Sequence, residues 1–199
     1  MRSDHYRTLV SSAEFRHKIE RSEFLGLAFP STSDDQFFEE LHRIEKKHFD
    51  ATHHCWAFRL FAEGESRQRS SDAGEPSGTA GKPILAAIEG ADVHDVGVVV
   101  VRWYGGVKLG TGGLARAYRD TAAETLRTAT LVDHFIYARY EVIVPYDMLS
   151  VAYRLVAPPD IILSAETFEE ENVFSFDVRR SAAEAFERTL TEKRLRLRH

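Results

Sequence analysis

The sequence predicts an α+β protein in two parts, because strand and helix patterns alternate along its length. A β-branched run at Val98–Val101 has the composition of a strand buried on both faces. Glycines crowd the loop that follows, and helical character resumes at Leu114. From residue 136 onward the patterns run strand, helix, strand, strand, helix, the order of a compact ferredoxin-like unit. A boundary near Asp133 therefore gives expected domains 1–133 and 134–199.

The N-terminal part is predicted to begin with three strands and a helix. Strands are expected at 6–10, 14–19 and 23–29, and a turn joins the second and third into a hairpin. Ser33 is predicted to cap a helix that runs to about Lys47. Gln36 completes a capping-box pattern with it, and apolar residues then recur at helical spacing.

Extended and helical segments alternate through the rest of this part. A strand is expected over 52–62, then charged residues 63–69, then a loop over 70–83 that holds three glycines and two prolines. A short helix over 84–89, the buried strand over 96–101 and a long helix over 111–129 complete the domain.

The C-terminal part is predicted to hold two helices and three strands. A strand is expected over 136–144 and a helix over 146–156, followed by a hairpin of strands at 161–168 and 173–179. Ser181 is predicted to cap the last helix, which runs to about residue 191. The basic tail that follows is given no role.

Composition narrows the classes of function. The formal net charge of −5 argues against a chain that is basic all over, although it leaves a local basic patch open. Cys55 is the only cysteine, so neither an intramolecular disulfide nor a cysteine-rich metal site is expected. Apolar segments long enough for a signal peptide or a membrane helix are lacking. A cytoplasmic protein with no membrane partner is expected.

The glycine-rich loop fits neither common nucleotide motif. Gly110–Ala115 fits G-x-G-x-x-A, but eight residues separate it from Val101 at the end of the strand, whereas a dinucleotide fingerprint follows its strand directly. The earlier glycine loop fails the P-loop pattern, because Pro76 and Pro83 stand where glycine and Ser or Thr are needed. No cofactor is expected.

A basic, glycine-rich surface is the binding hypothesis that remains. Residues 96–130 carry five basic side chains against two acidic ones. Free amides at a helix start approach a phosphate closely, arginine adds bidentate hydrogen bonds, and aromatic rings stack on bases. The residues leave open an equally weighted structural interpretation, in which the glycines serve tight turns and Arg102 pairs with a carboxylate. The candidate binding residues are Lys82, Arg102, Trp103, Tyr104, Gly105, Gly106, Lys108, Gly110, Gly112, Gly113 and Arg116.

Acid–base catalysis is the alternative. Asp72 and Glu75 lie three residues apart in the 70–83 loop, and His53 or His54 could join them. No nucleophile with an adjacent base accompanies them, so hydrogen bonds to loop amides are the favoured role. The two histidines are neighbours on a predicted strand and point to opposite faces, so no metal site is expected.

Three stretches carry a more specific pattern: HHCWA at 53–57, SDAGEPSGTAGKP at 71–83 and VVVRWYGGVKLGTGGLARAY at 99–118. Together they resemble the YigZ/IMPACT family, and residues 21–24 are similar to its early basic-Ser-x-Phe pattern. The chain departs from the family at Ala73, where relatives commonly carry a second Asp, which weakens an acid–base or metal role. It departs again at Trp103, where Tyr is more usual.

The resemblance implies a fold and a role. It implies an N-terminal domain similar to domain 2 of ribosomal protein S5, followed by a small ferredoxin-like domain. It also implies translational regulation. The sequence therefore predicts a binding protein that contacts RNA, the ribosome or a translation-associated protein through its basic glycine-rich loop. A hydrolase acting on a phosphorylated or peptide-like small molecule and a protein-interaction scaffold are the alternatives.

Overall fold

The computed structural model describes residues 4–62 and 65–198, which divide into two compact units. One unit spans Tyr6–Asp133, and the other joins residues 134–198 to the two residues that precede Tyr6. Residues 1–3, 63–64 and 199, which belong to the expected domains, lie outside the described part.

A two-stranded sheet pairs β1 (His5–Leu9) with β7 (Leu131–Phe135). The first of these strands matches the expected one, whereas the second was not predicted. Both ends of the larger unit are therefore fixed by backbone pairing.

The larger unit is built on a five-stranded antiparallel sheet in the order β2-β3-β6-β4-β5. The antiparallel pairing of β2 with β3 confirms the predicted hairpin. The strands of this sheet are β2 (Ala13–Ile19), β3 (Ser22–Pro30), β4 (His53–Ala62), β5 (Glu65–Ser71) and β6 (Val96–Trp103).

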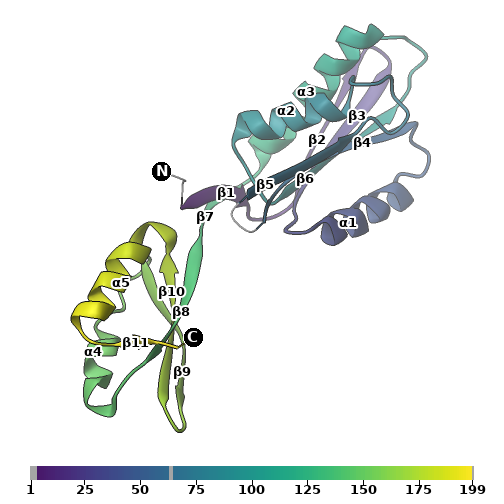
Figure 1. Cartoon of the computed structure of the whole chain (residues 1–199). Coiled ribbons are helices and arrows are strands. Elements are labelled where there is room, and N and C mark those ends of the chain that lie inside the picture. Colours follow the sequence, from purple (N-terminus) through teal and green to yellow (C-terminus); the bar gives the residue numbers. More distant parts are fainter. Residues whose placement is uncertain (1–3, 63–64, 199) are drawn as a thin grey trace. The chain divides into compact units, whose positions relative to one another are not determined.

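Helices cover both faces of this sheet (Figure 1). On one face lie α2 (Gly81–Ala91) and α3 (Gly110–Thr128), and on the other lies α1 (Asp34–Lys47). Side chains alternate along β6, so Val98 and Val100 belong to the α2/α3 core, whereas Val99 and Val101 belong to the α1 core. The predicted burial of this strand on both faces is confirmed.

The predicted cap of α1 is confirmed with one change in detail. Ser33 Oγ accepts a hydrogen bond from the Gln36 amide at 3.2 Å. The Gln36 side chain bonds back to the amide and hydroxyl of Thr32, at 3.0 and 2.9 Å, rather than to Ser33 itself. The capping box is thus displaced by one residue.

β5 was missed because the stretch that forms it is charged and lacks apolar alternation. It is an edge strand whose backbone pairs with β4, and an edge strand tolerates charged side chains that discourage further pairing. Arg67 and Arg69 of this strand bond to Asp34 at the start of α1.

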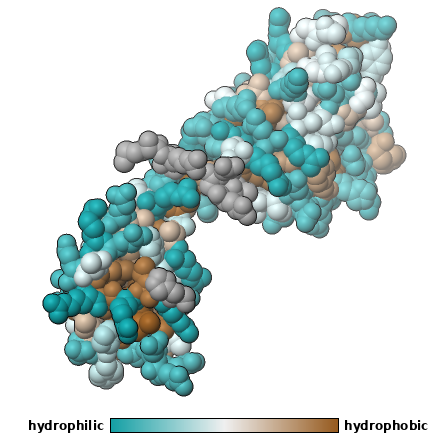
Figure 2. Space-filling view, viewed as in Figure 1, coloured by the Kyte–Doolittle hydropathy of each residue, from teal (hydrophilic) through white to brown (hydrophobic). Residues whose placement is uncertain are grey.

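The smaller unit has a four-stranded antiparallel sheet in the order β11-β8-β10-β9. Its core gathers Val142, Phe174, Phe176, Phe186 and Leu190. In Figure 2 hydrophobic atoms are visible in the middle of this unit, whereas hydrophilic residues dominate the visible surface of the larger one. The elements are β8 (Tyr137–Ile143), η1 (Tyr146–Met148), α4 (Leu149–Tyr153), β9 (Ile161–Phe168), β10 (Asn172–Arg179), η2 (Arg180–Ala182), α5 (Ala183–Glu192) and β11 (Arg196–Leu197).

Of two helix predictions for this unit, one is confirmed in part and one is wrong. The helix expected over 146–156 is present as a 3₁₀ turn (Tyr146–Met148) followed by the short α4, and it ends at Tyr153, three residues earlier than expected. Ser181 does not cap α5; it lies in η2, and its hydroxyl donates to the Asp4 carboxylate instead.

None of the helices within 4–62 and 65–198 combines the length and the apolar character that crossing a bilayer requires.

Gly26 is a point where β3 and α3 touch, and it gives a test of the packing. A Cβ at this buried position would lie 2.0 Å from Thr125 Oγ1 and 3.2 Å from the Thr121 carbonyl oxygen. We expect Gly26→Ala to lower the free energy of unfolding by about 1–3 kcal/mol through overpacking. Urea denaturation measures this. Gly90→Ala is the control, because a Cβ there meets nothing within 4 Å; equal stability of the two variants would contradict the packing.

Candidate functional site

The site begins with two cross-strand partners on the α2/α3 face of the sheet. His53 of β4 lies directly opposite Arg102 of β6, and Phe24 of β3 flanks Arg102 on the other side. The alternation that buries Val98 and Val100 under the helices carries Arg102 to the same face. The strand pattern therefore places a guanidinium inside the fold.

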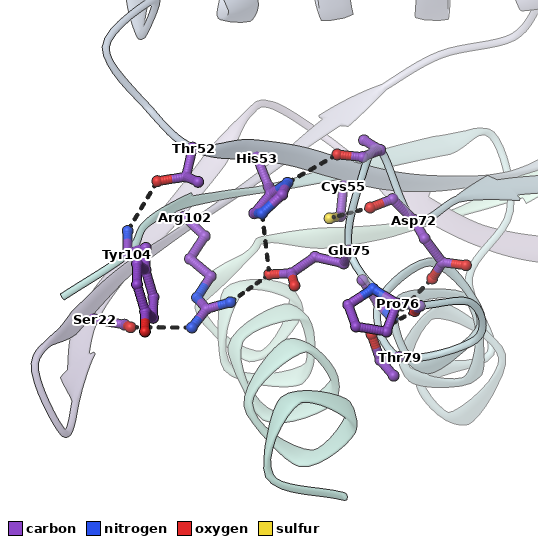
Figure 3. A network of polar contacts seen from close by, with 12 residues as sticks. Ser22, Thr52, His53, Cys55, Asp72, Glu75, Pro76, Thr79, Arg102 and Tyr104 are labelled. Carbon is purple, nitrogen blue, oxygen red and sulfur yellow. Dashed lines mark hydrogen bonds and ion pairs between the residues drawn. The ribbon is translucent and has the colours of Figure 1, made fainter. Parts of the chain in front are cut away.

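Glu75 receives this guanidinium. Arg102 Nη1 donates to Glu75 Oε1 at 2.5 Å, and Nη2 donates to Ser22 Oγ at 3.1 Å (Figure 3). The two charged side chains are only 5% and 4% exposed. The Tyr118 hydroxyl of α3 donates to the same carboxylate oxygen at 2.8 Å. A buried ion pair of this kind persists only with such added hydrogen bonds.

His53 completes the surroundings of Glu75. Its Nδ1 lies 3.0 Å from the Ala73 carbonyl oxygen, and because a carbonyl only accepts, this nitrogen carries the proton. Its Nε2 is left facing Glu75 Oε1 at 3.9 Å, beyond hydrogen-bond distance.

Asp72 organises the loop that presents Glu75. Its carboxylate accepts hydrogen bonds from the amides of Gly78, Ala80 and Gly81, at 2.7 to 2.9 Å, at the start of α2. Burial alone raises the pKa of Asp72, but these three amides and the charge of Lys82 lower it, and the net pKa lies below its usual value. The favoured prediction, that this carboxylate bonds loop amides, is confirmed.

Two further buried groups are locked in their protonated forms. Cys55 Sγ donates to the Asp72 carbonyl oxygen at 2.9 Å, and burial raises the pKa of this thiol to about 12. Burial likewise raises the pKa of Tyr118, so its hydroxyl keeps the proton that it donates to Glu75. Neither group has the character of a nucleophile.

A cavity of about 490 Å³ opens beside this network. Glu75, Arg102 and His53 line it together with Tyr104, Lys108 and the first turn of α3. Arg102 lies over the Tyr104 ring at 5.3 Å, and Tyr104 remains 44% exposed. The cavity thus combines a buried neutral pair, an aromatic ring and a cation.

The loop glycines have separate structural reasons. A Cβ at Gly105 would lie 1.8 Å from the Arg21 carbonyl oxygen, so the loop passes too close to the β2–β3 turn for any side chain. Gly106 and Gly110 have φ angles of +85° and +69°, which favour glycine. Gly112 has neither restriction. The cap residue of α3, Leu109, offers no side-chain bond to the first amides of the helix.

The structure brings together only part of the predicted binding set. Arg102, Tyr104, Lys108 and Gly110 line the cavity. Gly105 and Gly106 shape the loop. Three other members lie on α3 outside the cavity lining, namely Gly112, Gly113 and Arg116, and Lys82 is exposed on α2. Within the described residues, Lys82, Lys108 and Arg116 make no ion pair.

The prediction that Trp103 and Tyr104 together form a stacking surface is wrong. Trp103 joins the α1 core and its Nε1 donates to Asp50 at 3.1 Å, because it follows Arg102 on the strand and so faces the other side. His54 also faces away from the cavity, with Nε2 at 3.1 Å from the His48 carbonyl oxygen.

The role predicted for Arg102 as a phosphate ligand needs the same correction. Its buried side chain is already paired with a carboxylate, which is the structural interpretation that the sequence left open. The four residues of the predicted acid–base set do not lie together. Asp72 bonds the amides of its own loop, and only Glu75 and His53 face the cavity. In the part of the chain that the structure describes, no three His, Cys, Asp or Glu side chains are grouped to hold a metal.

Ser22 and Tyr118 are the members of the site that sequence reasoning missed. Ser22 lies in the basic-Ser-x-Phe pattern, and its hydroxyl accepts from both Arg102 and the Gly105 amide. Tyr118 was predicted only as an inward-facing residue of the helix. A buried tyrosine needs a partner for its hydroxyl, and that need was the available signal.

A family model and individual relatives from the IMPACT family, which the sequence resembles, both match this chain. A family model described as the Impact N-terminal domain matches residues 20–126. An IMPACT family member of Haemophilus influenzae is 31% identical over 92% of this chain and 89% of its own length. The IMPACT family member YvyE of Bacillus subtilis is 30% identical over 94% of this chain and 86% of its own.

A solved structure described as a hypothetical protein is also similar. It superposes with a TM-score of 0.71 at 27% identity and covers 98% of this chain and 97% of its own.

The carboxylate of Asp72 gives a pH-dependent stability. A carboxyl whose pKa is lowered on folding stabilises the protein fully above the unfolded value of 3.8, and this stabilisation is lost as the pH falls below that value and through the lower folded pKa. We expect Asp72→Asn to be less stable than the parent protein at neutral pH and the difference to shrink below about pH 5. Thermal unfolding across pH measures it. Glu89→Gln, an exposed change on α2, is the control, and a pH-independent difference for Asp72→Asn would contradict the assignment.

The buried pair gives a second test. We expect Arg102→Met to lower the free energy of unfolding by about 3–5 kcal/mol, because it leaves the Glu75 charge buried without its partner. The double variant Glu75→Gln, Arg102→Met should recover part of that loss, which a double-mutant cycle in urea measures. Arg127→Met, in an exposed pair, should cost less than about 1 kcal/mol. Additive effects at positions 75 and 102 would rule out the coupling.

Proposed function

Because this chain belongs to the IMPACT family, we propose that it is a regulatory binding protein of translation that contacts RNA or the ribosome through the cavity beside the glycine-rich loop. The translational role rests on the family membership. The contact with RNA rests on one local observation: Tyr104, Lys108 and the uncapped start of α3 line the same cavity.

The chemistry of these groups supports single-stranded RNA as the ligand. Helix-start amides and an unpaired lysine attract a phosphate, and an exposed aromatic ring stacks a base. Lys108 is the cation for this role, since the charge of Arg102 is already neutralised by Glu75. The net charge of −5 limits the attraction to this local surface.

We also propose a fold type for each unit, from its strand order or from the family resemblance. In the smaller unit, the order β8-α4-β9-β10-α5-β11 with the sheet order β11-β8-β10-β9 supports a ferredoxin-like domain. In the larger unit, the family resemblance supports likeness to domain 2 of ribosomal protein S5. The domain division 1–133 and 134–199 is proposed accordingly, although the described residues 4 and 5 group with the smaller unit in the structure.

Lys108→Ala tests the RNA contact. We expect weaker binding of short single-stranded RNA. We also expect the negative slope of log affinity against log salt to become shallower by about 0.7, since one phosphate contact is lost. Fluorescence anisotropy over a series of salt concentrations measures both quantities. Lys46→Ala, an exposed lysine of α1 on the opposite face of the sheet, is the matched control. An unchanged slope for Lys108→Ala would remove this residue from the site.

A further inference from the structure

The Glu75 carboxylate has one oxygen in use and one free. Oε1 accepts from Arg102 at 2.5 Å and from Tyr118 at 2.8 Å, while Oε2 has no hydrogen-bond partner among the residues that the structure describes. Figure 3 shows this difference between the two oxygens. The Glu75 side chain is 4% exposed, and Glu75 lines the cavity. Oε2 is therefore an acceptor at the cavity wall that makes no hydrogen bond with the described part of the protein.

Oε2 has no protein partner among the described residues and is not fully enclosed, so it faces the cavity, where a donor on a ligand can take the place of water. The donor has to be an N–H or O–H group, because a carboxylate accepts hydrogen bonds. A cationic donor fits poorly, since Arg102 already neutralises Glu75 and Lys108 adds a positive charge to the same lining. A neutral N–H group on a ligand that carries its negative charge elsewhere satisfies both requirements.

Nucleotides whose bases carry an exocyclic amine have this composition. Cytosine presents N4–H₂, and its pairing with a carboxylate is an established mode of base recognition; adenine and guanine also carry amines. Uracil has no exocyclic amine, and its one base N–H, at N3, lies between two carbonyl oxygens, which a carboxylate repels. A volume of about 490 Å³ lies in the range of small-ligand pockets.

The remaining groups of the cavity fit the other parts of such a nucleotide. The Arg102 guanidinium carbon lies 5.3 Å from the centroid of the Tyr104 ring, on one side of it. Tyr104 is 44% exposed, so it offers a ring face for stacking. Lys108 and the start of α3 suit the phosphate.

We propose that this cavity is a base-selective pocket that takes one unpaired nucleotide carrying an exocyclic amine, with Glu75 Oε2 as the acceptor that selects it. The proposal rests on the RNA contact proposed above and adds selectivity to it. It assigns Glu75 a role in specificity, whereas its pairing with Arg102 accounts only for stability.

The test compares oligomers that differ only in the base. Short single-stranded RNAs of cytidine, of uridine, and of a cytidine analogue with hydrogen in place of the 4-amino group are titrated into the full chain by fluorescence anisotropy. We expect the cytidine oligomer to bind at least about fivefold tighter than the uridine oligomer, and the amine-free analogue to fall to the uridine level. Glu75→Gln should reduce this preference while Glu89→Gln keeps it, with circular dichroism verifying the fold of both variants.

The outcomes separate the two proposals. Equal affinity for all three oligomers, with binding that still depends on Lys108, overturns the base pocket and leaves the RNA contact standing. Absence of binding to every oligomer overturns both. If Glu75→Gln fails to fold, the amine-free oligomer on the unmodified protein decides the question, because that comparison needs no substitution.

Discussion

The ion pair between Glu75 and Arg102 is the interaction on which the arrangement of the site depends. It joins the loop before α2 to the central strand, and its hydrogen bonds extend to Ser22 of β3 and Tyr118 of α3. Four segments far apart in the sequence thus meet at two buried charges. Because an unpaired charge would be costly at that depth, each segment is constrained by the others.

This constraint divides the polar residues of the region into two groups. Asp72, Cys55 and the Nδ1 atom of His53 are occupied with the backbone of the 72–81 segment and fix its path. Glu75 Oε2 and the Lys108 ammonium have no described partner, so they are available to a ligand. Binding at this site would therefore proceed on a largely preformed surface, which reduces the entropy lost on ordering.

Local patterns in the sequence predicted the scaffold better than the site. The valines of β6 and the Ser33 cap express rules that act over a few residues, and the structure follows them. The Glu75–Arg102 contact spans 27 positions and begins in a loop without periodicity, so no spacing rule selects that carboxylate as the partner. Ser181 failed as a cap for a related reason, because Asp4, 177 positions away, takes its hydroxyl.

The network lies within the part of the chain that matches the family model. Ser22, Glu75, Arg102 and Tyr118 all fall inside residues 20–126, the segment that matches the family model, and all belong to the larger unit. The smaller unit keeps its own core and contributes no residue to the cavity. The buried pair and the described residues that line the cavity therefore come from the same unit, so the geometry proposed for the ligand is set by the packing of that unit's own sheet and helices.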